Sequence, residues 1–133
     1  WVIERCYAES YGGFIQHIDV DGKEPEKQFL VTDYEGIPAA WDSKIWWVQA
    51  EAVVGFLNAW QKKPEETKYL DAAKDIWGYI KEYVIDKREG SEWFWCVNAD
   101  GSPIHEPIVE PWKCPYHNGR MCMEVIGRLK DAE

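Results

Sequence analysis

The residues with the greatest capacity for chemistry lie together near the end of the chain, in the segment Glu-Pro-Trp-Lys-Cys-Pro-Tyr-His-Asn-Gly-Arg-Met-Cys-Met-Glu at positions 110–124. The segment leads from a proline-punctuated loop into a predicted helix, and loops carry function more often than the elements they join. An imidazole can act as a general acid or base near neutral pH, which makes His117 the candidate catalytic residue. The alternative is that His117 only caps or packs the helix.

A second candidate site is the segment Lys-Ile-Trp-Trp-Val-Gln-Ala-Glu at positions 44–51. Trp47 and Glu51 are four residues apart and therefore share one face of a predicted helix. An indole ring can stack on a flat sugar ring while a neighbouring carboxylate accepts hydrogen bonds from the hydroxyls. The alternative is that Trp46 and Trp47 belong to the core and Glu51 is an ordinary surface acid.

The remaining motifs argue against a metal centre. Cys114, His117 and Cys122 form a C-x2-H-x4-C pattern of soft ligands, but no fourth ligand stands at a zinc-like spacing. We therefore predict no metal ion. His17, in an alternating stretch, is expected to be structural, and His105, in a polar loop, to be solvated. The sequence carries no glycine-rich phosphate loop and no Ser-His-Asp nucleophile pattern.

Composition narrows the class of ligand. Acidic residues outnumber basic ones, 24 to 15, so the net charge of −9 argues against a nucleic-acid partner. Nine Trp, seven Tyr and four Phe are more aromatic residues than the core of a 133-residue chain needs, and they favour a sugar-stacking surface. No apolar run is long enough to span a membrane, and no signal-peptide pattern is present. We expect the four cysteines to be reduced thiols of a cytoplasmic protein.

Hydrophobic periodicity predicts a mainly helical chain with a few short strands. Helices are expected at 1–9, 44–61, 64–86 and 118–130, strands at 14–20 and 92–97, an Asp-Gly turn at 21–22, and a long loop at 102–116. Asp42 or Ser43 is expected to cap the second helix. A very short link near Pro64 predicts that the second and third helices are antiparallel neighbours. The last helix is expected to bury Met121, Val125, Ile126 and Leu129.

The segments 44–52 and 112–124 together resemble the N-acylglucosamine 2-epimerase superfamily, and the second segment is most similar to its cellobiose 2-epimerase (mannobiose 2-epimerase) branch. The segment 92–97 with its following Asp-Gly turn fits the same family. The resemblance spans essentially the whole chain. It implies that residues 1–133 are a single partial domain, the C-terminal third of an (α/α)6 barrel with short antiparallel ribbons in its loops.

The resemblance also implies a reaction. Family members invert C2 of the reducing-end sugar of a β-1,4-linked disaccharide, without a cofactor or a metal. The sugar ring opens, one histidine removes the C2 proton to form an enediolate, and a second histidine returns a proton from the opposite face. The positions of this sequence that match the family's site are His117 as one of the two histidines, Trp47, Glu51 and Trp112 as sugar-holding residues, and Asn118 and Arg120 as orienting or polarising residues.

The second histidine of the family has no counterpart in this sequence. We therefore expect it on a helix of a missing N-terminal part, and we expect the 133-residue fragment to be inactive alone. The faces that missing helices would cover are apolar, so self-association of the fragment is a further expectation. The expected binding partner is the disaccharide substrate; neither a nucleic acid nor a membrane is expected.

Other functions stay open at this stage. An N-acylglucosamine epimerase or a mannose isomerase of the same superfamily would use similar residues. A glycoside hydrolase on an α/α barrel would need two opposed carboxylates, for which Glu51 and Glu124 are available. A non-catalytic sugar-binding module would use the tryptophan-rich surface alone.

Overall fold

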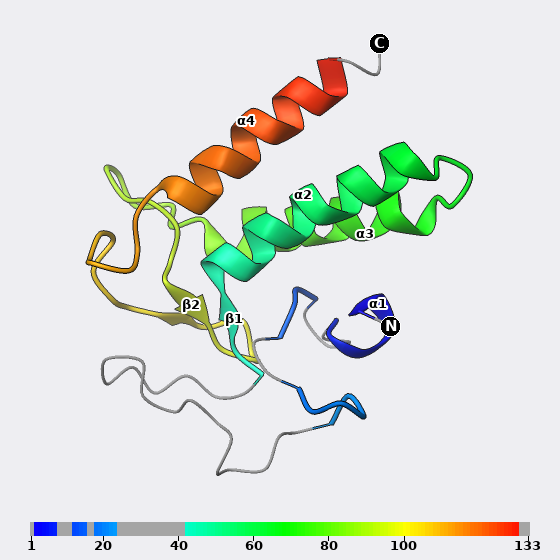
Figure 1. The fold of residues 1–133 in the computed structure, drawn as a ribbon. Helices are drawn as coiled ribbons and strands as arrows, with labels where there is room; N and C mark the ends of the chain where they lie inside the picture. Colours follow the sequence, from blue (N-terminus) through cyan, green and yellow to red (C-terminus); the bar gives the residue numbers. More distant parts are fainter. Residues whose placement is uncertain (1, 8–11, 16–17, 24–41, 131–133) are drawn as a thin grey trace.

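The computed structural model describes residues 2–7, 12–15, 18–23 and 42–130, and within them the chain is mainly helical with one small antiparallel sheet (Figure 1). The elements in chain order are α1 (Val2–Arg5), β1 (Lys44–Ile45), α2 (Trp46–Lys62), α3 (Lys68–Tyr79), the π-helical turn η2 (Ile80–Val84), β2 (Cys96–Val97), β3 (Pro103–Ile104) and α4 (Tyr116–Lys130). This confirms the predicted class.

Helix α2 is the centre of the core. It packs against both α3 and α4, and the three helices lie beside one another in Figure 1. Ala50 is fully buried, and Val53, Val54 and Leu57 follow it at helical spacing with at most 6% of their surface exposed. A short turn joins α2 to α3, so the two helices run antiparallel, as predicted.

The third helix differs from the prediction at both ends. It begins at Lys68, because the residues from Pro64 to Thr67 form a turn. Just before this turn, the amide of Lys63 donates a hydrogen bond back to α2. At its other end the helix changes to π-helical geometry in η2, where the amide of Ile85 donates to the carbonyl of Ile80 at 3.0 Å. Ile80 and Val84 are thereby both fully buried.

The sheet corrects two expectations. Lys44 and Ile45, predicted as the start of a helix, form β1 and pair with β2, so neither Asp42 nor Ser43 caps α2. Pro103–Ile104, predicted as loop, is an edge strand paired with β2. The pairing of β1 with β2 joins residues about 50 positions apart, and local periodicity carries no information about it.

Of the strand and turn predicted at 14–22, the described residues show a bridge and the turn. The strand expected at 14–20 reduces to a single bridge between Phe14 and Tyr7, and residues 16–17 lie outside the described ones. The predicted Asp-Gly turn is present, with Gly22 at a φ of 80° that glycine adopts without strain.

Helix α4 is less buried than predicted. It begins at Tyr116, two residues before the expected start, and Met121 is 2% exposed. Val125 is partly buried against the core, but Ile126 is 56% exposed and Leu129 is 49% exposed, so burial of these two residues is a wrong expectation. Their side chains instead border an open groove.

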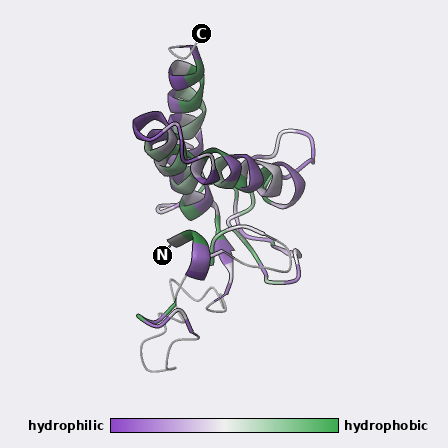
Figure 2. Ribbon diagram, turned by 90° about the vertical axis from the view of Figure 1, so that its right-hand side faces the viewer, coloured by the Kyte–Doolittle hydropathy of each residue, from purple (hydrophilic) through white to green (hydrophobic). Residues whose placement is uncertain are grey.

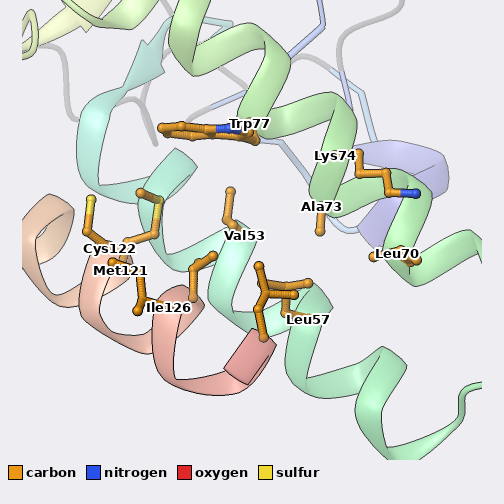
Figure 3. A pocket seen from close by; sticks show the side chains of 11 residues that line it. Val53, Leu57, Leu70, Ala73, Lys74, Trp77, Met121, Cys122 and Ile126 are labelled. Carbon is orange, nitrogen blue, oxygen red and sulfur yellow. The ribbon is translucent and has the colours of Figure 1, made fainter. Parts of the chain in front are cut away.

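That groove lies between α2, α3 and α4 and has a volume of about 360 Å³ (Figure 3). Leu57, Trp77 and Ile126, one from each helix, are among the side chains that line it. The hydropathy colouring of Figure 2 shows that the helices carry polar as well as apolar residues. Among the described residues, no helix has both the length and the apolar content needed to cross a membrane.

A buried glutamine ties the N-terminal segment to α2. The side chain of Gln49 is fully buried; its Oε1 accepts from the amide of Phe14 at 2.7 Å, and its Nε2 donates to the carbonyl of Phe14 at 2.8 Å. A single side chain thus provides both hydrogen bonds that a neighbouring strand would supply. The sequence analysis did not single out this residue.

We predict that Gln49→Leu lowers the free energy of unfolding by about 2–6 kcal/mol, because it leaves two buried backbone groups unpaired at roughly 1–3 kcal/mol each. Urea denaturation followed by tryptophan fluorescence measures the effect. Gln61→Leu is the matched control: Gln61 also makes two hydrogen bonds, both to Arg128, but in an exposed position where water replaces them. Equal losses in the two variants would contradict the role of Gln49.

Candidate functional site

The candidate site is built where the first turns of α2 and α4 meet. His117 lies in the first turn of α4, and its Nδ1 is 2.9 Å from Oε1 of Glu51 on α2. Arg120, one turn further along α4, donates from Nη1 to the other oxygen of Glu51 at 2.5 Å. One carboxylate of α2 therefore holds two side chains of α4.

Aromatic rings surround the imidazole of His117. The centroid of the Trp47 ring lies 5.7 Å from that of His117, and the Tyr116 ring meets it edge-on at 5.0 Å. Trp46 approaches from the core side at 6.4 Å. The imidazole remains 31% exposed, so a ligand can reach it.

This arrangement specifies which ring nitrogen is available. A carboxylate can only accept hydrogen bonds, so the Nδ1 of His117 carries the hydrogen that it donates to Glu51. In the neutral imidazole the lone pair then lies on Nε2, which is the atom able to accept a proton from a ligand. Glu51 also stabilises the positive charge that such a transfer creates.

The electrostatics of Glu51 agree with that role. Burial raises the pKa of Glu51, but hydrogen bonds from His117 and Arg120, together with the charge of Arg120, outweigh burial and leave the pKa below its usual value. Glu51 is therefore a carboxylate throughout the neutral range, and the interaction in turn raises the pKa of Arg120.

The two predicted sugar platforms are both accessible. Trp47 is 41% exposed and Trp112, in the loop before α4, is 56% exposed. Trp46, the other tryptophan of the pair, is 3% exposed and belongs to the core. The alternative in which Trp47 is a core residue is therefore wrong.

Asn118 is bonded to a different carboxylate from the one that holds His117. Its Nδ2 donates to Oε1 of Glu92, and the second oxygen of Glu92 accepts from Nζ of Lys113. Sequence analysis missed Glu92 and Lys113. Lys113 does belong to the quoted motif, but a lysine is ordinarily expected at the surface, and only the fold reveals that it is buried.

The other candidates do not join this site. His105 is exposed, as predicted, and its ring meets Phe94 edge-on with centroids 5.5 Å apart; His17 lies outside the described residues. The Glu124 carboxylate is bonded to Arg128 at 3.2 Å.

The cysteines carry free thiols. Cys114 and Cys122 are exposed, and within the described ranges no group of three or more His, Cys, Asp or Glu side chains could hold a metal ion. Cys96 is buried, and burial raises the pKa of its thiol to about 11.

The apolar groove is chemically unlike a sugar site. Its lining side chains are almost all hydrophobic, whereas sugar hydroxyls require hydrogen-bonding partners. None of the predicted site residues lines it.

Comparison with known proteins defines the class. Residues 7–120 match the family described as N-acylglucosamine 2-epimerase (GlcNAc 2-epimerase), and the chain belongs to that family. Within it, the chain is 61% identical over 90 residues to the cellobiose 2-epimerase of Ruminococcus albus, covering 67% of this chain and 23% of that protein. It is 53% identical over 125 residues to the cellobiose 2-epimerase of Eubacterium cellulosolvens, covering 94% of this chain and 27% of that protein.

Solved structures agree. A sugar epimerase from a ruminal bacterium superposes with a TM-score of 0.64 at 58% identity, over 67% of this chain and 23% of that one. A D-mannose isomerase superposes with a TM-score of 0.73 over 93% of this chain and 27% of that one, but at 18% identity it shows the fold alone. The matched residues cover about a quarter of the length of these relatives.

We predict a pH-dependent stability difference between wild type and Glu51→Gln. Because the folded pKa of Glu51 is below 4.5, its contribution is fully present above that pH and is lost as the pH falls through the folded value. The thermal midpoint of the variant should be lower than that of wild type from pH 7 to about pH 5, and the gap should close below about pH 4.5.

Glu65→Gln, in the exposed turn between α2 and α3, serves as the control for removal of a carboxylate. Scanning calorimetry across the pH series measures both variants. A gap for Glu51→Gln that does not close below about pH 4.5 would contradict the assigned interactions.

Proposed function

We propose that the protein containing this chain inverts C2 of the reducing-end sugar of a β-1,4-linked disaccharide of the cellobiose or mannobiose type. The observation that carries the proposal is the imidazole of His117, held by the Glu51 carboxylate beside the exposed ring of Trp47. The substrate class rests on the relatives that are named cellobiose 2-epimerases.

The chemistry begins with the open-chain sugar, whose C1 carbonyl acidifies the C2 proton. Nε2 of His117 takes that proton, and the electron pair of the C2–H bond forms the C1–C2 double bond of an enediolate. Glu51 stabilises the imidazolium that results. The proton transfers need only side chains as acids and bases, so we propose that the reaction uses neither a metal nor a cofactor.

Inversion needs a second acid on the opposite face of C2, because a proton returned by His117 would regenerate the starting sugar. When the second group protonates C2 from that face, the electron pair of the C1–C2 double bond forms the new C2–H bond, an oxygen electron pair restores the C1 carbonyl, and the epimer is formed. Among the described residues, His105 packs against Phe94 and is not placed for this role. We propose that a second histidine comes from the part of the protein that this chain does not contain.

The remaining site residues have positioning roles in this proposal. Trp47 and Trp112 offer exposed indoles on which the two sugar rings stack. Arg120 holds Glu51, and through it His117. Asn118 acts through Glu92 and orients the start of α4.

The test is His117→Asn in the complete protein. We expect the turnover number to fall by roughly 10²–10⁴-fold, the range typical for loss of a general acid or base. Proton NMR in D₂O measures the new anomeric signals and the exchange of the C2 proton. His105→Asn is the matched control and should retain activity.

The products separate the alternatives. An epimerase yields an aldose disaccharide of equal mass, an isomerase yields a ketose, and a hydrolase yields monosaccharides. Full activity of His117→Asn would refute the acid–base role, and persistent sugar binding without turnover in the wild type would favour a binding module.

A second prediction concerns the isolated chain. We propose that residues 1–133 form one partial domain of a cytoplasmic enzyme, and that the open apolar groove makes the isolated chain self-associate. Incubated with cellobiose or mannobiose, the 133-residue chain should show no C2 exchange. Turnover at a rate close to that of the complete protein would contradict the need for a second histidine.

A further inference from the structure

We propose that the buried Lys113 and the partly exposed Glu92 form an ion pair that positions His117 through Asn118. Neither residue was expected to contribute to the site. The proposal rests on the proposed function, since it concerns how the proposed base is held. It adds two positioning residues that touch neither the imidazole nor the expected place of the sugar.

Lys113 has all the features of a fixed ammonium group. Its side chain is fully buried, and Nζ donates to Oε2 of Glu92 and, at 3.0 Å, to the carbonyl of Ile108. The same Nζ lies 5.6 Å from the centroid of the Trp46 ring, within range of a cation–π interaction. A charge held from three sides has little freedom to move.

Glu92 transmits that position to α4. Its Oε2 is bonded to Lys113, and its Oε1 accepts from Nδ2 of Asn118, the residue directly after His117. The pair therefore connects the segment before β2, the loop that carries Trp112, and the first turn of α4.

The loop itself is braced on its other side. The indole of Trp95 donates to Glu110 at 3.1 Å, and the amide of Glu110 donates to the carbonyl of Lys113 at 3.0 Å. These bonds fix the backbone from which the Lys113 side chain enters the interior. The first turn of α4 is then held by two carboxylates, Glu51 acting on His117 and Glu92 acting on Asn118.

Stability alone is a poor reason for such a pair. Desolvation of two charges offsets most of their attraction, so an apolar pair of similar volume would stabilise the protein about as well. What an ion pair with hydrogen bonds adds is a defined distance and direction. A base that must meet a C2 proton in line requires both, because a misplacement of about 1 Å can slow a reaction by roughly 100-fold.

The experiment compares three variants of the complete protein: Lys113→Met, the double variant Lys113→Met/Glu92→Gln, and Glu92→Asp. The single variant leaves the partly buried carboxylate of Glu92 without its cation and should unfold at a lower temperature than wild type. The double variant removes both charges and should recover most of the thermal midpoint. Glu92→Asp keeps the charge but is one methylene too short to reach both Lys113 and Asn118.

For the double variant and for Glu92→Asp, with native circular dichroism, we expect kcat to fall about 10- to 100-fold while KM for cellobiose changes less than about threefold. A merely structural role would restore kcat together with the thermal midpoint. If either well-folded variant keeps kcat within twofold of wild type, the positioning role is overturned. Glu92→Asp decides the question if the double variant does not fold.

Two controls separate this proposal from the proposed function. Lys63→Met/Glu66→Gln removes an exposed ion pair in the turn between α2 and α3 and should leave kcat unchanged. His117→Asn is measured in the same assay. If His117→Asn is inactive while the Glu92 variants are unaffected, only the positioning proposal fails; if His117→Asn is fully active, both fail.

Discussion

The burial of α2 between α3 and α4 is the constraint on which the candidate site depends. Ala50 has no exposed surface, so α2 cannot rotate about its axis without opening the core. That fixed rotation directs Gln49 towards Phe14 and, on the other side of Ala50, directs Glu51 towards α4. Neighbouring residues on a helix point about 100° apart, and this protein uses two such directions for two different polar connections.

The start of α4 shows how charge can replace apolar packing. Much of the apolar face of this helix remains open, and burial alone would hold its first turn only loosely. Two carboxylates from different segments, Glu51 and Glu92, hold it instead. Each accepts hydrogen bonds from two side chains, so each restricts direction as well as distance.

The open groove is consistent with the chain matching only part of the length of its relatives. The chain corresponds to 23–27% of the length of the cellobiose 2-epimerases that it matches. An open apolar face on α3 and α4 is the feature expected of part of a larger protein. The groove is therefore better understood as an unfilled packing surface than as a ligand site.

The amino-acid sequence by itself determined the long helices and the identity of the principal site residues. The apolar residues of α2 and α3 recur at helical spacing, and a helix bonds each residue to one four positions away, so a short window of sequence contains the relevant information. Trp47, Glu51 and His117 could be named because their residue types are chemically distinctive and because the segments around them resemble a family.

Only the tertiary structure decided the rest. The strands at Lys44–Ile45 and Pro103–Ile104 exist because each pairs with Cys96–Val97. This partner lies about 50 residues from the first strand and is separated from the second by a short turn. Burial of Lys113 and exposure of Ile126 both reverse what their residue types favour. Lys113 is buried because Glu92 supplies the opposite charge, and Ile126 is exposed because no described segment covers its side of the groove. In both cases the deciding factor is the presence or absence of a packing partner distant in sequence, which local pattern cannot reveal.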